Sequence, residues 1–108
     1  MTIQEYQERA LATAKYGAGN AIIYPALGMN GEAGEVAEKI KKVLRDKNGV
    51  FDEESKVEIL KEIGDVLWYC NALCRDLGYS LEFCMQVNIA KLESRKYRDV
   101  ISGNGDNR

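Results

Sequence analysis

The sequence predicts an all-α protein in which about four helices pack as a bundle. Apolar residues recur every three or four positions along most of the 108-residue chain, which is the spacing of one helix face. No segment shows the alternation of apolar and polar residues that is typical of a half-buried strand. Glycine-containing turns such as Asp46–Gly49 separate the periodic segments, so they mark where helices end and begin.

The first helix is expected over about residues 2–17. Thr2 and Glu5 have the Thr-x-x-Glu spacing of a capping box at its start. The second helix is expected over about residues 26–46, and Pro25 fits a first turn, where no backbone N–H donor is needed. Three glycines weaken the first half of this helix, each by about 1 kcal/mol relative to alanine: Gly28, Gly31 and Gly34.

The third helix is expected over about residues 53–77, with Asp52 as its N-cap. The fourth helix is expected over about residues 81–100, with Ser80 in the same capping role. Because the acidic motifs described below fall in the second and third helices, we expect these two helices to form a hairpin with approximate internal symmetry.

The chain length implies one domain, which we assign to residues 1–101, followed by a flexible polar tail at 102–108. The formal net charge of −2 argues against a nucleic acid polymer as a partner. No apolar run approaches the roughly 20 residues of a membrane span, and the first residues do not resemble a signal peptide. We therefore expect no membrane partner and a cytoplasmic location, in which the three cysteines are small buried hydrophobes.

Two segments of the chain repeat the order acid, any residue, glycine, acid, valine. Positions three apart share one helix face, so each segment presents a pair of carboxylates there. In both helices the pair lies along the same edge of an apolar stripe. Packing the helices through these stripes brings four carboxylates toward one place. The two segments are Glu32-Ala33-Gly34-Glu35-Val36 and Glu62-Ile63-Gly64-Asp65-Val66.

Clustered carboxylates repel one another strongly where the dielectric constant is low, so bound cations would stabilise them. Oxygen ligands of this kind suit Mg²⁺, with Mn²⁺ as a substitute. The chain has no histidine, which excludes Ser–His and Cys–His catalysis. The alternative interpretation is that the acids are ordinary solvated residues at the boundary of two amphipathic helices.

Gly34 and Gly64 lie between the two acids of each pair, in the middle of a predicted helix. Glycine in this position usually permits another backbone to approach closely. The neighbour would be another helix of the chain or a second subunit. Since four helices from 108 residues also leave a small core, we expect a homodimer or a dimer of dimers.

With these motifs the chain resembles the MazG-like, all-α nucleoside triphosphate pyrophosphohydrolases, whose signature is Glu-x-x-Glu followed by Glu-x-x-Asp. The resemblance implies Mg²⁺-dependent hydrolysis of nucleotides between the α and β phosphates. By position it implies that four acids bind the metal: Glu32, Glu35, Glu62 and Asp65. Glu38 lies one turn further on and would hold or deprotonate the attacking water, unless it is simply an exposed helix acid.

Candidate substrate-binding residues lie on three helices. Lys39 and Tyr69 are each seven residues after the first acid of a motif, so Lys39 is assigned to a phosphate and Tyr69 to the base or sugar. Trp68 is a second stacking candidate, unless it packs against the first helix. A further set shares one face of the fourth helix and is assigned to the phosphates, with a solvated surface as the alternative: Asn88, Lys91 and Arg95.

The expected reaction is attack by water at the α phosphorus. The expected role is house-cleaning of the nucleotide pool. The sequence has no Gly-x-x-x-x-Gly-Lys-Ser/Thr loop to enclose the β and γ phosphates. Within the same class of enzyme, a dUTP or dCTP specialist and a phosphoribosyl-ATP pyrophosphatase are alternatives. Outside it, the alternative is a helical protein-interaction module without catalysis.

Overall fold

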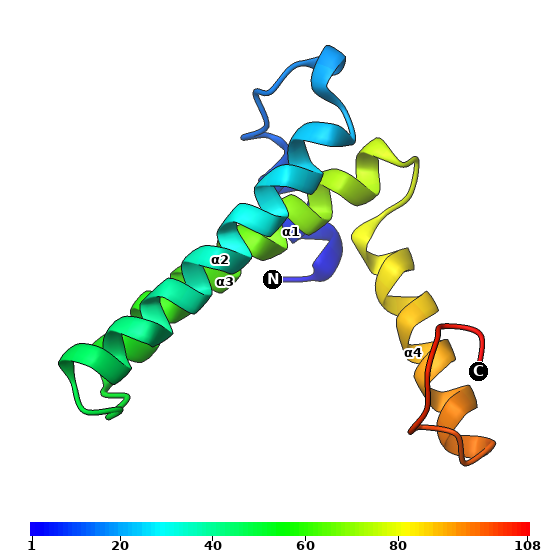
Figure 1. Cartoon of the computed structure of the whole chain (residues 1–108). Helices are drawn as coiled ribbons and strands as arrows, with labels where there is room; N and C mark the ends of the chain where they lie inside the picture. Colours follow the sequence, from blue (N-terminus) through cyan, green and yellow to red (C-terminus); the bar gives the residue numbers. More distant parts are fainter.

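A hairpin of two long helices forms the centre of the protein. The computed structural model describes residues 1–108, in which α2 (Ile23–Asp46) and α3 (Glu53–Asp76) lie side by side (Figure 1). The N-cap predicted for α3 is confirmed, since the Asp52 carboxylate accepts a hydrogen bond from the backbone N–H of Ser55 at 2.8 Å. This cap fixes where the chain re-enters a helix after the turn.

The chain contains four α-helices and no strand, which confirms the predicted all-α fold class. None of the helices combines the length and the apolar character that a membrane span requires. The elements outside the hairpin are α1 (Ile3–Leu11), the short 3-10 turn η1 (Ala18–Asn20) and α4 (Leu81–Tyr97).

The start of α1 follows the sequence prediction. Thr2 Oγ1 accepts a hydrogen bond from the Glu5 N–H at 3.1 Å, and the Glu5 carboxylate accepts one from the Thr2 N–H at 3.2 Å. The Asn71 side chain of α3 donates to the Gln7 carbonyl at 3.2 Å. This bond ties α1 to the middle of α3.

The end of α1 differs from the prediction, because the helix stops at Leu11 and not near residue 17. The Ala10 carbonyl accepts hydrogen bonds from the Trp68 indole at 3.1 Å and from the Thr13 hydroxyl at 2.7 Å. The same carbonyl accepts a backbone bond from the Thr13 N–H at 3.0 Å, so the helix ends in a tighter turn that the two side chains reinforce. A residue distant in sequence, Trp68, therefore contacts the point where α1 ends.

The start of α2 is held by the end of α3. The helix begins at Ile23, earlier than the predicted residue 26, and Pro25 lies fully buried in its first turn as expected. Ile22 has a φ of 69°, a left-handed conformation that is strained for a β-branched residue. Asp76 stabilises it by accepting hydrogen bonds from the Ile22 N–H at 3.0 Å and the Tyr16 hydroxyl at 2.7 Å.

α4 diverges from the hairpin and extends away from it (Figure 1). The predicted cap is confirmed, since Ser80 Oγ accepts a hydrogen bond from the Phe83 N–H at 3.0 Å. The first turn of α4 contacts α1, where the Glu82 N–H donates to Gln7 Oε1 at 2.8 Å. Within one chain, α4 therefore meets the other helices only near its N-terminus.

Residues 98–108 fold back along α4. Asp99 has a φ of 57°, and the Val100 N–H donates to the Arg95 carbonyl at 2.8 Å. This reversal ends α4 at Tyr97 and not near residue 100. The Arg108 guanidinium donates to carbonyls of the folded-back segment, those of Val100, Ile101 and Gly105. The residues expected to form a flexible tail thus lie against the last turns of α4.

The hydrophobic core of a single chain is small. Large apolar side chains remain exposed along α3, including Leu60 at 62%, Ile63 at 47% and Leu67 at 43%. These three recur at helical spacing, so one face of the hairpin is apolar and uncovered in the single chain. Only eight of 108 residues are buried, and the hydrophobic ones among them, apart from Pro25, are Ala10, Val43, Ala72 and Leu81.

Candidate active site

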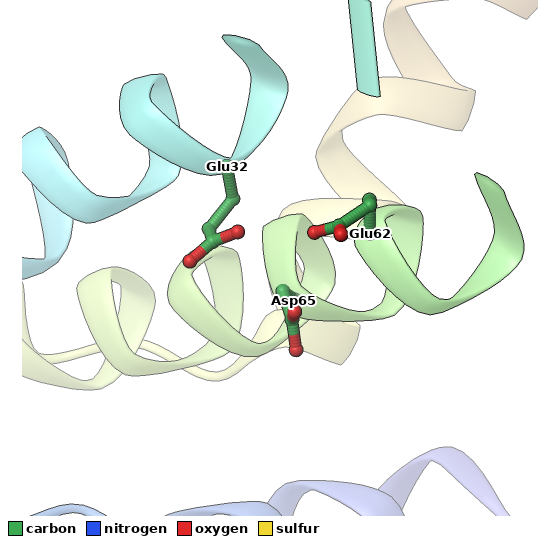
Figure 2. A group of neighbouring side chains, drawn as sticks. All are labelled: Glu32, Glu62 and Asp65. Carbon is green, nitrogen blue, oxygen red and sulfur yellow. The ribbon is translucent and has the colours of Figure 1, made fainter. Parts of the chain in front are cut away.

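Three carboxylates from the two helices of the hairpin form a compact group. Glu32 projects from α2, and Glu62 and Asp65 project from α3 (Figure 2). One carboxylate oxygen of each residue lies within 4.8 Å of those of the other two. The spacing of three places Glu62 and Asp65 on one face of α3, and the packing of the hairpin places Glu32 opposite them.

The electrostatic environment of this group favours a cation. Partial burial raises the pKa of Glu32 above its ordinary value, and the negative charges of Asp65, Glu62 and Glu35 raise it further. A bound divalent ion would remove this repulsion, since each carboxylate would then face a positive charge. The donor set consists of oxygen only, which fits Mg²⁺ or Mn²⁺.

The other two predicted acids of α2 lie outside the group of three. Glu35 is exposed one turn further along α2, although its charge still reaches Glu32. Glu38 pairs with Lys41 at 2.9 Å on the same helix, and this hydrogen bond lowers the pKa of Glu38. The tertiary structure therefore brings three of the five predicted acids together.

Lys39 is the cation that lies beside the acidic group. Its Nζ is 3.9 Å from Glu62 Oε1 and 3.7 Å from Glu58 Oε2. Both ion pairs are long and partly exposed, so they restrain the lysine only weakly. Lys39 is thus within reach of the acids without being fixed to either partner.

A pocket of about 410 Å³ opens directly beside the carboxylates. Its five lining residues combine two acids, two aromatic rings and a hydroxyl: Thr13, Glu32, Asp65, Trp68 and Tyr69. The Tyr69 ring meets the Trp68 ring edge-on, with centroids 5.0 Å apart, and lies 6.3 Å from the Tyr24 ring. The site therefore combines a cluster of carboxylates with an aromatic wall.

Trp68 and Tyr69 have different roles in this wall. The Trp68 indole N–H donates to the Ala10 carbonyl and to the Thr13 hydroxyl, at 3.1 and 2.8 Å. Trp68 thus packs against α1, as one of the two predicted interpretations required. Tyr69 makes no comparable bond to α1 and contributes its ring to the pocket wall.

The three predicted phosphate ligands on α4 do not meet the acids within this chain. Asn88 is exposed. Lys91 Nζ lies 3.1 Å from the Asp106 carboxylate, and Arg95 Nη2 lies 3.5 Å from it. Arg95 is only 6% exposed, and it also donates to the Gly105 and Asp106 carbonyls. In the single chain, the Asp106 carboxylate of the folded-back segment forms ion pairs with both cations of α4.

The glycines of the two motifs have no close neighbour within the chain. The sequence predicts such a neighbour at Gly34 and Gly64, yet no other part of the chain lies within 4 Å of a Cβ placed at either position. A close approach of this kind occurs earlier in α2, at Gly28, which faces Tyr69. The chain itself therefore does not explain Gly34 and Gly64 by packing.

Sequence reasoning missed two residues of the site. Thr13 was included in the predicted first helix, but it lies beyond α1 and bonds to Trp68 at the pocket edge. From the sequence, Gly28 was recognised only as one of the glycines that lower the stability of the second helix. Its role depends on which side chain of α3 faces it, and no local pattern carries that information.

The fold and the site define a helical protein with a cluster of three carboxylates, spaced closely enough to bind a metal ion, at the centre of a two-helix hairpin. Residues 26–98 match the MazG nucleotide pyrophosphohydrolase domain, a span that includes both acidic motifs and α4. The chain belongs to this family. It is similar to the gene 37 protein of Mycobacterium phage L5, with 46% identity over 114 aligned positions that cover the whole of both chains. No solved structure matches the chain.

Proposed function

We propose that the protein is a Mg²⁺-dependent nucleotide pyrophosphohydrolase that converts a nucleoside or deoxynucleoside triphosphate to the monophosphate and pyrophosphate. The observation that carries the proposal is the group formed by Glu32, Glu62 and Asp65, with oxygens within 4.8 Å, beside an open aromatic-walled pocket. Membership of the MazG family supports the same class of reaction.

The carboxylates are the residues that would hold the metal, with Glu35 completing the set from its exposed position. When bound, Mg²⁺ supplies charge neutralisation for the phosphates and a lowered pKa for a coordinated water. The chain itself provides an all-oxygen donor set and a partly desolvated site, where electrostatic attraction is stronger than in bulk water. Glu38 is the candidate for orienting or deprotonating the water, after release from Lys41.

The remaining residues orient the nucleotide. Tyr69 offers a ring face for the nucleoside, and Lys39 offers an ammonium group near the acids for a phosphate. Attack would occur at the α phosphorus, because the acids lie next to the aromatic wall and not at the far end of a triphosphate-binding loop. The departing group is then pyrophosphate.

Asn88, Lys91 and Arg95 would complete the site from α4 of a second copy of the chain. Two observations support a homodimer or a dimer of dimers. α4 diverges from the α2–α3 hairpin that carries the acids (Figure 1), and α3 leaves an apolar face uncovered. Burying such a face in a symmetric interface would enlarge the small core.

The role we propose is house-cleaning of the nucleotide pool in the cytoplasm. A dUTP or dCTP specialist and a phosphoribosyl-ATP pyrophosphatase would use the same acids, so a substrate panel is needed to separate them. A non-catalytic helical interaction module is the alternative of a different class. It predicts no Mg²⁺-dependent stabilisation by a non-hydrolysable nucleotide.

The experiment is to incubate the protein with Mg²⁺ and a panel of ribonucleotides, deoxyribonucleotides and phosphoribosyl-ATP in ¹⁸O-labelled water. We expect pyrophosphate as the released product and the label in the monophosphate. Label in pyrophosphate would mean attack at the β phosphorus. Release of free phosphate with a diphosphate product would overturn the reaction class.

A further inference from the structure

The Tyr69 ring lies directly against the backbone of α2 at Gly28. A Cβ placed on Gly28 would overlap Cε1 and Cζ of the ring and would lie 2.6 Å from Cδ1. Three atoms of one rigid ring are involved, so the whole ring must shift to admit a side chain at position 28. The ring can occupy this position only because residue 28 has no side chain.

Neighbouring helical glycines do not share this restriction. At Gly31, Gly34 and Gly64 no atom outside the local backbone lies within 4 Å of the position that a Cβ would take. Alanine would fit at each of them and would improve helix propensity by roughly 1 kcal/mol. The need for glycine is therefore specific to Gly28 among the glycines of the hairpin helices.

The contact is one helical turn from the carboxylates on both helices. Gly28 and Glu32 are four residues apart on α2, and Asp65 and Tyr69 are four apart on α3, so each pair shares a face. Tyr69 also meets Trp68 edge-on at 5.0 Å, and Trp68 is bonded to α1. The ring is thus restrained by the α2 backbone and by a fixed indole while it still lines the pocket.

We infer that Gly28 is a positioning residue for the proposed reaction. Its missing side chain allows Tyr69 to lie against α2 and form the stacking wall for the nucleoside, next to Glu32 and Asp65 in the same pocket. A side chain at position 28 moves the ring into the pocket or forces the two helices apart, one turn from the carboxylates. The inference rests on the proposed function for its ligand, but the contact itself does not.

The test compares Gly28→Ala with Gly31→Ala, and repeats Gly28→Ala in a Tyr69→Ala background. In the background that retains Tyr69, we expect Gly28→Ala to raise KM for the best nucleotide of the panel about tenfold, with a smaller change in kcat. Gly31→Ala should leave both constants within about twofold. In the Tyr69→Ala background, Gly28→Ala should change KM less than twofold, because the clashing ring is gone.

Thermal unfolding tests the contact independently of activity. Gly28→Ala should lower Tm by several degrees in the Tyr69 protein, and should leave Tm unchanged or raise it in the Tyr69→Ala background. Equal effects of Gly28→Ala in both backgrounds, or an unchanged KM with a normal Tm, would overturn the inference. Absence of hydrolysis by the wild-type protein would instead overturn the proposed function, while the unfolding comparison would still decide whether Gly28 positions Tyr69.

Discussion

Glu32 and Asp65 come from different helices, yet their carboxylate oxygens lie within 4.8 Å of each other beside the Tyr69 ring. Burial and the charges of Asp65 and Glu62 raise the pKa of Glu32. Two negatively charged groups therefore lie close together in the lining of a pocket with aromatic walls. It is the arrangement from which the effects of metal, pH and substitution on this protein follow.

Replacing Glu62 by glutamine removes one charge from the group while preserving the shape of the side chain. We expect nucleotide hydrolysis to fall roughly 100-fold or more, because one metal ligand is weakened. The helical circular dichroism signal should be unchanged. Glu54→Gln, an exposed acid in the first turn of the same helix, is the matched control and should retain activity. Full activity of Glu62→Gln would rule out the metal assignment.

The stability of the metal-free protein should depend on the charge of Glu32. Its pKa in the folded state lies above the ordinary value of 4.5, so the folded state binds more protons than the unfolded state between the two values. The free energy of unfolding contributed by Glu32 therefore falls as pH rises through this range. Above it, the ionised group destabilises the fold until Mg²⁺ is added.

Measuring Tm against pH for wild type and Glu32→Gln, in EDTA and in Mg²⁺, would test this. The variant removes the contribution of Glu32 and leaves the acids whose pKa values are lowered, such as Asp52 at about 2. We expect the variant to be more stable than wild type near pH 7 in EDTA. We also expect Mg²⁺ to raise the Tm of wild type more than that of the variant. Identical curves would contradict the prediction.

Asp106 pairs with the two cations of α4 that we assign to phosphate, at 3.1 and 3.5 Å. Because Asp106 is 82% exposed, these pairs should add at most about 1 kcal/mol to stability. Asp106→Asn should therefore leave Tm nearly unchanged and lower KM for the nucleotide by a few-fold, since Lys91 becomes available, whereas Arg95 keeps its bonds to the Gly105 and Asp106 carbonyls. Asp99→Asn, in the turn after α4, should change neither. A raised KM would instead mean that the folded-back segment supports binding.

We expect the exposed apolar face of α3 to be buried in an interface between two copies of the chain. Leu60→Glu places a charge on that face, where the leucine is 62% exposed. We expect sedimentation at micromolar concentration to give a dimer or tetramer for wild type and a smaller species for the variant, with loss of activity. Val50→Glu, equally exposed at 63% in the turn of the hairpin, should leave the assembly intact. A fully active wild-type monomer would refute the prediction.

Features that depend on neighbours in sequence could be predicted from the sequence. Thr2, Asp52 and Ser80 cap their helices as expected, because each cap closes a bond to a backbone N–H three residues away. The four helices follow from apolar periodicity in the same way. The pairing of Glu62 with Asp65 on one face of α3 also follows from spacing alone.

Features that depend on which helices meet required the tertiary structure. Trp68 bonds to the last turn of α1, and the close approach occurs at Gly28 and not at Gly34 or Gly64. The sequence placed four equivalent acids along two stripes, but the packing of α2 on α3 brings only one acid of the first motif into the group. Helix periodicity fixes the face on which a residue lies, whereas the rotation and register of two packed helices decide which residue on that face has a partner.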